Sequence, residues 1–255
     1  MEHLVSGRSE SAGRRRPSLH VALAAGESEI LAAQKLRWRV FADEMGARLP
    51  SRTPGVDRDI YDPYCEHLIV RDEDNGRIVG TYRILAPESA VQVGSYYSEN
   101  EFDLTRLAHL RPRMVELGRS CIDADYRTGA TIALLWSGLA RYMQENGHEY
   151  LIGCASIGMK DGGHNAAGIY HGLAEAQIAP PEYRVFPRCP LPLDKISPAE
   201  QPEVPPLLKG YLRAGAWICG EPAWDPDFNT ADLLIMLPMA RIDARYTRHF
   251  VERRN

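Results

Sequence analysis

Apolar residues recur at helical spacing in the segment ESEILAAQKLRWRVFADEM, residues 27–45. Gly46 follows directly and is a typical helix stop signal. The pattern predicts an amphipathic helix over 27–45, which a polar loop over 47–65 follows. One broad face of this helix collects six apolar side chains, those of Ile30, Leu31, Ala33, Leu36, Val40 and Phe41.

A change of period marks the next segment, HLIVRDEDNGRIVGTYRIL, residues 67–85. Two runs rich in β-branched and apolar residues flank the sequence Asp74-Asn75-Gly76. Asn-Gly between two such runs is a strong turn signal, because both residues tolerate a positive φ. The segment therefore predicts a β-hairpin, and a loop follows over 86–100.

The remaining pattern alternates strands and helices, with a proline-dense surface excursion over 180–206 and a mixed segment over 207–219. We expect one domain over 23–240 with an α/β (α+β) fold, whose mixed, mostly antiparallel central sheet is flanked by helices and turns parallel between 115 and 155. The expected strands are 113–123, 150–157 and 232–237, and the expected helices are 129–145 and 165–176.

Composition narrows the class of protein. The chain has 255 residues, 44% hydrophobic residues and a net charge of −4, so nothing global indicates a nucleic-acid partner. Residues 1–22 predict a disordered tail, and 241–255 predict a basic amphipathic tail with five arginines. Neither a signal peptide nor an apolar run long enough to cross a bilayer is present, so we expect a cytoplasmic protein.

Metal and disulfide chemistry are not indicated. The five cysteines are widely spaced and form no CxxC pair, which favours reduced thiols. Cys121 lies in an apolar strand, where thiols are usually inert. His164 and His171 lack a neighbouring ligand at metal-binding spacing, so we expect no metal.

The stretch VELGRSCIDADYRTGATIALLW, residues 115–136, joins a strand to a helix through a turn of small residues. Helix N-termini bind anions, Gly129 permits close approach of a ligand, and Arg127 adds a permanent cation. Neither GxxxxGK[ST] nor GxGxxG is present. Two interpretations remain open: a phosphate cradle at Arg127, Thr128, Gly129 and Ala130, or a tight turn with a surface arginine.

Several motifs occur in a fixed order: LRWRVFADEMG (36–46), VDRDIYD (56–62), CEHLIV (65–70), VGTYRIL (79–85) and MVELGRSCID (114–123). This order resembles the acyl-homoserine-lactone synthases. The chain resembles the ornithine acyl-ACP N-acyltransferases more closely, because it also carries their DYR-x-G loop, LW-x-GLA helix and C-terminal DLLIML. The resemblance spans roughly 30–240.

The resemblance implies a GNAT-like acyltransferase fold and an N-acyltransferase activity. The implied reaction moves a 3-hydroxyacyl group from acyl carrier protein to the α-amine of ornithine. Its product is lyso-ornithine lipid, the first intermediate of ornithine lipid biosynthesis. The implied donor is the phosphopantetheine arm of the carrier protein, with no tightly bound cofactor. The loop at 127–130 has fewer glycines than the usual GNAT loop, which fits a single phosphate better than a diphosphate.

The same resemblance suggests roles for individual residues on the donor side. The cradle 127–130 is expected to hold the pantetheine phosphate. Arg37, Arg39 and Phe41 are expected to cover the donor site, and Tyr170 is placed where many GNAT enzymes protonate the leaving thiolate.

On the acceptor side, Glu116 is the candidate general base or ammonium anchor, since a buried carboxylate has a raised pKa. The alternative for Glu116 is a structural ion pair with Arg83 or Arg119. Arg83 and Arg119 are expected to bind the acceptor carboxylate or to pair with aspartates. The remaining candidates for the acceptor pocket, which a solvated turn would equally explain, are Asp57, Asp59 and Asp62.

Acyl carrier protein is strongly acidic, so we expect docking through Arg127, Arg141 and the basic tail. The tail is also expected to touch the inner membrane face transiently, because the product is a lipid. Three alternatives remain open: an acyl-homoserine-lactone synthase, an N-acyltransferase for glycine, lysine or glutamine, and an acyl-binding module without turnover.

Overall fold

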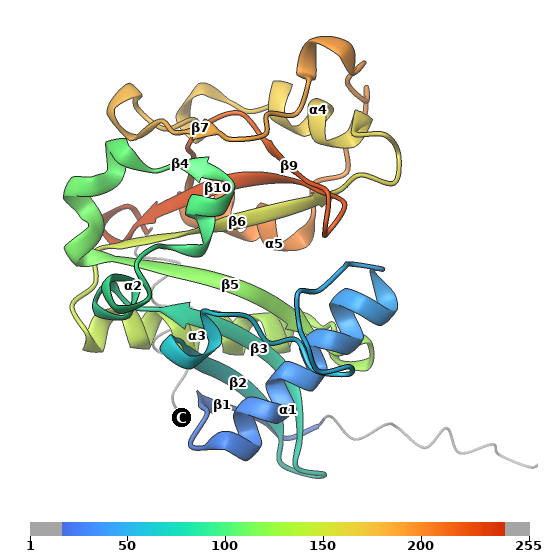
Figure 1. Cartoon of the computed structure of the whole chain (residues 1–255), viewed down its shortest axis with the longest axis vertical. Coiled ribbons are helices and arrows are strands. Elements are labelled where there is room, and N and C mark those ends of the chain that lie inside the picture. The colour runs from blue at the N-terminus through green and yellow to red at the C-terminus, as the bar shows by residue number, and fades with distance from the viewer. Residues whose placement is uncertain (1–16, 243–255) are drawn as a thin grey trace, which may run out of the picture.

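The computed structural model describes residues 17–242 of the chain, shown in Figure 1. Its centre is an eight-stranded mixed sheet with the order β1-β2-β3-β5-β6-β10-β8, and β9 pairs with β10 outside this path. The strands of this sheet are β1 (Leu19–Leu23), β2 (Glu66–Asp72), β3 (Arg77–Leu85), β5 (Met114–Ile122), β6 (Tyr150–Gly158), β8 (Trp217–Ile218), β9 (Ala223–Asp225) and β10 (Thr230–Pro238).

Helices cover both faces of the sheet (Figure 1). Helices α1 (Glu27–Trp38) and α2 (Pro87–Val93) lie on one face, and α3 (Gly129–Glu145), α4 (His164–His171) and α5 (Pro206–Ala214) pack on the other. Helix α1 continues into a π-helical turn, Arg39–Glu44. A second, two-stranded sheet joins β4 (Phe102–Asp103) to β7 (Phe186–Pro187).

Short 3-10 turns fill the connections. Their bounds are Asp62–Tyr64, Tyr97–Asn100, Thr105–Arg113, Ala124–Tyr126, Glu175–Gln177, Pro181–Tyr183, Leu193–Lys195 and Met239–Arg241. The proline-dense stretch over 180–205 contains only two of these turns and the two-residue strand β7, so it is the irregular excursion that its composition predicts.

The structure confirms the predicted hairpin as β2 and β3, with Gly76 at φ 72° in its turn, and the helix over 129–145 as α3. The helix expected over 165–176 ends earlier, at His171. The loop expected over 86–100 contains α2, which begins at Pro87, a residue suited to a first helical turn.

The domain boundaries also differ from the prediction. Residues 19–22 were placed in a disordered tail, but Leu19–Leu23 form β1, which pairs antiparallel with β2 and packs Val21 against the core. Residues 1–16 and 243–255, which include most of the predicted basic tail, lie outside the described residues. Arg241 is described, and its guanidinium lies 4.2 Å from the ring centroid of Trp217.

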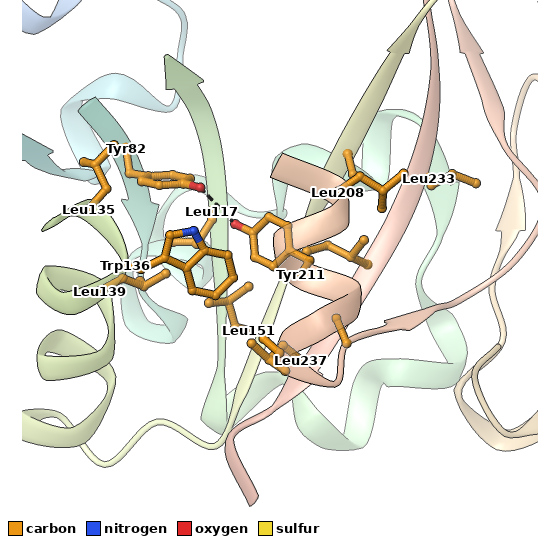
Figure 2. Packing of buried hydrophobic residues seen from close by; sticks show 14 of the residues in the cluster. Tyr82, Leu117, Leu135, Trp136, Leu139, Leu151, Leu208, Tyr211, Leu233 and Leu237 are labelled. Carbon is orange, nitrogen blue, oxygen red and sulfur yellow. Dashed lines mark hydrogen bonds between the residues drawn. The ribbon is translucent and has the colours of Figure 1, made fainter. Parts of the chain in front are cut away.

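An aromatic cluster fills the core beneath the middle of the sheet (Figure 2). Tyr82 of β3 and Tyr211 of α5 lie 3.3 Å apart at their hydroxyl oxygens. The ring centroids of Trp136, on α3, and Tyr211 are 4.7 Å apart. These side chains come from three separate elements, so they tie α3 and α5 to the sheet below the region where two central strands separate.

The central strands β5 and β6 run parallel and pair only over Met114–Glu116 and Tyr150–Ile152. A Cβ on Gly153, the next residue of β6, would lie 2.5 Å from the carbonyl oxygen of Leu117. Glycine at this position therefore lets the two backbones touch where they begin to diverge.

Substitution of Gly153 by alanine is expected to lower the free energy of unfolding by about 2 kcal/mol, since overpacking against backbone has no flexible side chain to relieve it. Gly158→Ala on the same strand is the control, because a Cβ at that position would meet nothing within 4 Å. Urea denaturation measures both, and equal unfolding midpoints for the two variants would contradict the close contact.

Candidate active site

The site is built where β5 and β6 part. Beyond Glu116 no residue of β5 pairs with β6 in the described chain. On its other edge β5 carries a bulge opposite β3. Thr81 pairs with Cys121 and Arg83 with Gly118, so one residue of β3 lies opposite two residues of β5 between these pairs. Arg119 lies inside this bulge at φ 51°, a left-handed conformation that costs energy for a residue with a side chain. Bulges of this kind redirect side chains next to functional sites.

A cavity of about 590 Å³ opens between the separated strands. Its aromatic and apolar walls include Phe41, Tyr82, Tyr97, Tyr211 and Phe228. The guanidinium of Arg119 lies between two of these rings, 4.8 Å from the centroid of Tyr97 and 4.8 Å from that of Phe228. A cavity of this size that combines aromatic walls with charged side chains is typical of small-molecule sites.

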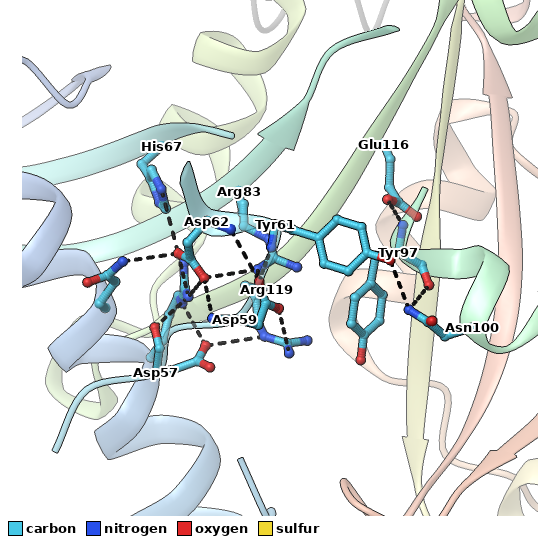
Figure 3. A network of polar contacts seen from close by, with 12 residues as sticks. Asp57, Asp59, Tyr61, Asp62, His67, Arg83, Tyr97, Asn100, Glu116 and Arg119 are labelled. Carbon is cyan, nitrogen blue, oxygen red and sulfur yellow. Dashed lines mark hydrogen bonds and ion pairs between the residues drawn. The ribbon is translucent and has the colours of Figure 1, made fainter. Parts of the chain in front are cut away.

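Beside the cavity, three aspartates of the loop before β2 meet three arginines in a buried network (Figure 3). Arg37 of α1 pairs with Asp57 at 2.7 Å and with Asp62 at 2.9 Å. The other ion pairs join Arg83 to Asp59 at 2.7 Å and Asp62 at 3.2 Å, and Arg119 to Asp57 at 3.2 Å and Asp59 at 3.3 Å.

The network contains three arginines and three aspartates, so its formal charges cancel, and this keeps Asp62 ionised. Burial opposes ionisation of Asp62, but the guanidinium groups of Arg37 and Arg83 outweigh it and hold the pKa of Asp62 well below its usual range. The structure thus brings together all five residues expected to bind the acceptor, and it shows them paired with one another. Of the five, Arg119 also lines the cavity between β5 and β6.

Glu116 lies at the end of the parallel pairing and is 3% exposed. Its carboxylate accepts hydrogen bonds from the backbone N–H of Tyr97 at 2.6 Å, from the N–H of Ser98 at 2.7 Å and from the Ser98 hydroxyl. Burial raises the pKa of Glu116, and the bonds from Ser98 and Tyr97 oppose this rise. The carboxylate therefore anchors the Tyr97–Asn100 turn, which forms one wall of the cavity; its role as a base stays a prediction.

The predicted phosphate cradle lies at the start of α3. Thr128 caps the helix, and its hydroxyl accepts from the N–H of Thr131 at 3.4 Å. The half-exposed Arg127 lines the cavity and pairs with Glu44. Thr128 and Ala130 line a separate recess beside Asp72 and Arg77, and a Cβ at Gly129 would meet nothing within 4 Å.

The other candidates are distributed around the site. Phe41 lines the cavity and packs edge-on against Phe228, whereas Arg37 is buried in the ion-pair network. Arg39 pairs with Asp123 at 3.0 Å, next to the start of α3. Tyr170 lies on α4, packs against the core and is absent from the lining of the described cavity. Its predicted role therefore has no geometric support among these residues.

Sequence reasoning missed several cavity residues. Glu101, Asp225 and Asp232 line the cavity, as do Tyr97 and Ser98. One signal was available: Asp232 interrupts the apolar run ADLLIML of β10, where a charged residue is unusual. Cys121 lines the cavity, and burial raises the pKa of its thiol to about 12, as expected for an unreactive cysteine.

Comparisons with known proteins agree with this geometry. Residues 36–137 match the family model described as an acetyltransferase (GNAT) domain. Together with the divergent parallel pair and its cavity, this match defines a GNAT-fold acyltransferase.

Curated relatives narrow the class. Over 250 residues the chain is 38% identical to the L-ornithine N(alpha)-acyltransferase of Agrobacterium fabrum, covering 91% of this chain and 85% of that protein. It is 36% identical to the protein of the same name from Brucella abortus, covering 91% and 89%. The chain belongs to the L-ornithine N(alpha)-acyltransferase family.

Two solved structures share the fold. The acyl-homoserine-lactone synthase LasI superposes with a TM-score of 0.54 at 16% identity, covering 92% of this chain and 95% of that one. The CoA-dependent synthase BjaI gives 0.55 at 15% identity, covering 91% and 89%. At these identities the likeness concerns the fold alone. None of the helices within residues 17–242 is long and apolar enough to cross a membrane.

Proposed function

We propose that this protein transfers a 3-hydroxyacyl group from acyl carrier protein to the α-amine of ornithine and thereby forms lyso-ornithine lipid. The choice of ornithine as the acceptor is supported by the 38% identity, over 91% of the chain, to a protein named L-ornithine N(alpha)-acyltransferase. The cavity between β5 and β6 supports acyl transfer, because it joins an apolar, aromatic space to unpaired strand backbone.

The reaction requires the acceptor nitrogen to attack the thioester carbon. A C–N bond forms and the C–S bond breaks; the nitrogen loses two protons, one to the base before attack and one as the intermediate collapses, and the thiolate gains one proton. Beyond Glu116, backbone N–H groups of β5 that have no partner on β6 are suited to polarise the thioester carbonyl. The narrow space between the two strands holds the reactants together, which lowers the entropic part of the barrier.

For the donor, we propose that the phosphopantetheine arm enters between β5 and β6 with its phosphate at the start of α3. The first N–H groups of a helix have no intrahelical partner and attract anions. Arg127 adds a half-exposed guanidinium at the same point. Arg39 is held close to this point by its ion pair with Asp123.

Proton transfer requires a base for the ammonium and an acid for the thiolate. We propose Glu116 as base or ammonium anchor on its burial and raised pKa, and Tyr170 as proton donor to the thiolate on family resemblance alone. Asp57 and Asp59 act through Arg119, which they orient towards the cavity, and Asp62 supports the same network through Arg37 and Arg83. The edge of the Arg119 guanidinium that borders the cavity is then suited to the acceptor carboxylate.

We propose that electrostatic attraction guides docking of the carrier protein. The acidic carrier protein meets arginines at the cavity entrance, and the enzyme works at the cytoplasmic face of the membrane, where its basic C-terminus touches anionic lipid transiently. The C-terminal stretch lies outside the described residues, so the support for this contact is its composition.

Mass analysis of the product tests the proposed function. The purified protein is mixed with 3-hydroxyacyl carrier protein and with ornithine, glycine, lysine, glutamine or S-adenosylmethionine. We expect N-acylornithine and release of carrier thiol with ornithine. An acyl-homoserine lactone from S-adenosylmethionine, or binding of the carrier without thiol release for every acceptor, would refute the proposal.

Substitution of Arg127 by glutamine is expected to raise KM for the acyl carrier protein about tenfold, since it removes a charge-assisted contact to phosphate. KM for ornithine should stay unchanged. Arg113→Gln is the control. The side chain of Arg113 is also 48% exposed, but Arg113 directly precedes β5, pairs with Glu149 and does not line the cavity. The wild-type KM should also rise with salt, and salt-independent binding would argue against arginine-guided docking.

A further inference from the structure

Three carboxylates from distant parts of the chain form a carboxylate cluster on the wall of the cavity between β5 and β6. Glu101 follows the Tyr97–Asn100 turn, Asp225 ends β9, and Asp232 lies on β10. Each offers an oxygen that lies within 4.8 Å of those of the other two. All three line the cavity. The cluster is separate from the aspartate–arginine network, which lies around Arg37 and Arg83.

Two acids of the carboxylate cluster, Glu101 and Asp232, lack the donors that buried acids normally have, whereas Asp225 Oδ1 accepts from the N–H groups of Asp227 and Phe228. Asp232 is 3% exposed, and its Oδ1 has no hydrogen-bond partner among the described residues. The same holds for both carboxylate oxygens of Glu101. Within residues 17–242, no arginine or lysine forms an ion pair with any of the three acids. Buried oxygens without a donor are rare and call for a ligand or a shared proton.

The electrostatics favour a cationic ligand. Burial and the neighbouring carboxylate of Asp232 raise the pKa of Glu101, and burial raises the pKa of Asp232. Like charges at this distance in a low dielectric repel strongly, so ionisation of all three acids is unfavourable without a compensating cation. A bound cation would relieve this repulsion.

We propose that the carboxylate cluster binds an alkylammonium group of the acceptor amino acid, a subsite that rests on the proposed function. An ammonium group has three N–H donors, and the cluster presents three buried oxygens without a donor: Glu101 Oε1, Glu101 Oε2 and Asp232 Oδ1. Without the ammonium, the raised pKa of Glu101 keeps a proton shared between Glu101 and Asp232; the incoming ammonium displaces this proton to solvent, and its three N–H groups then meet these three oxygens.

The position of the subsite fits an acceptor beside the reacting thioester. Asp232 pairs with Ser156 of β6, four residues beyond Ile152, which is the last residue of β6 that pairs with β5. The cluster therefore lies within the opening between the strands. Tyr97 and Phe228 line the same cavity and provide aromatic surface for the carbon chain of the amino acid, while Arg119 lies between their rings.

Calorimetric titration of the wild-type protein and of Asp232→Asn tests the subsite. Asp194→Asn, which removes an exposed acid outside the cavity, is the charge-matched control. The probes are ornithine, norvaline (which has the α-ammonium but no side-chain ammonium) and n-butylammonium, each with EDTA present. We expect Asp232→Asn to weaken ornithine binding about 30-fold and Asp194→Asn to leave it unchanged.

The probes identify which ammonium is bound. If Asp232→Asn weakens norvaline and ornithine equally, the cluster holds the α-ammonium; if it weakens ornithine alone, the cluster holds the side-chain ammonium. Wild-type affinity of Asp232→Asn for ornithine and n-butylammonium overturns the proposal. Ornithine binding that requires a divalent cation and disappears in EDTA also overturns it.

Two further readouts separate the possible failures. The melting temperature of Asp232→Asn should equal or exceed that of the wild type, since the substitution removes repulsion with Glu101; Glu101→Gln provides a second variant for binding if Asp232→Asn unfolds. If the wild type forms no N-acylornithine but binds n-butylammonium through Asp232, the proposed function fails while the subsite stands.

Discussion

Substitution of Arg37 by methionine is expected to lower the free energy of unfolding by about 3 kcal/mol, because it leaves three buried aspartates to share the two arginines Arg83 and Arg119. Arg37 is fully buried and pairs with Asp57 and Asp62 at once. Methionine keeps much of the side-chain volume, so the effect reports charge and not a cavity. Urea denaturation at pH 7 measures it.

The pH dependence of this loss has a defined sign. The pKa of Asp62 is lowered in the folded protein, so its ion pairs stabilise the fold at pH values above the unfolded pKa of about 4 and lose that contribution as pH falls further. The difference between wild type and Arg37→Met should therefore be smaller at pH 3 than at pH 7.

The control for Arg37 is its neighbour Arg39, which is half-exposed and pairs with Asp123. Arg39→Met should cost less than about 1 kcal/mol, as surface pairs usually do. A variant at Arg37 that is as stable as the variant at Arg39 would mean that the buried network does not stabilise the loop before β2.

Substitution of Glu116 by glutamine is expected to reduce stability by about 2 kcal/mol, since bonds to a buried carboxylate are stronger than neutral ones and the new amide NH₂ faces a backbone N–H. The bonds at risk come from Tyr97 and Ser98. Turnover should fall as well, by at least about tenfold, because these residues form a wall of the cavity.

The pH profile of turnover decides whether Glu116 is also the base. Ser98→Ala is the matched control: it removes the hydroxyl bond and keeps the carboxylate. If Glu116 is the base, Glu116→Gln loses the acidic limb of the kcat profile and Ser98→Ala retains it. Near-normal turnover of Glu116→Gln across the pH range would exclude the base role and leave Glu116 as a positioning residue.

Some predictions from the sequence succeeded because their signals are local. Asp74-Asn75-Gly76 marked the hairpin turn, and the helix over 129–145 was found with both of its ends. The parallel pair between 115 and 155 followed from the strand–helix–strand order. The loop over 86–100 was less accurate, because α2 is a single short helix with a weak apolar period.

The partners of the charged residues were harder to predict. The aspartates at 57, 59 and 62 are consistent with a solvated turn, an acceptor pocket or an ion-pair network, since all three use the same residue types. The structure shows the network, which α1, β3 and β5 complete with one arginine each. For Glu116 the sequence predicts a base or an ammonium anchor, with an ion pair to Arg83 or Arg119 as the alternative; among the described residues Glu116 forms no ion pair and accepts hydrogen bonds from the Tyr97–Asn100 turn.

The sequence by itself determined the mixed sheet, the order of its central elements, the acyltransferase resemblance and the loop at the start of α3, because each depends on local patterns and on the order of short motifs along the chain. Only the tertiary structure decided the bulge at Arg119, the separation of β5 from β6 and the carboxylate cluster of Glu101, Asp225 and Asp232. These features arise from strand register and from contacts between residues far apart in the chain, and neither propensity nor spacing encodes them.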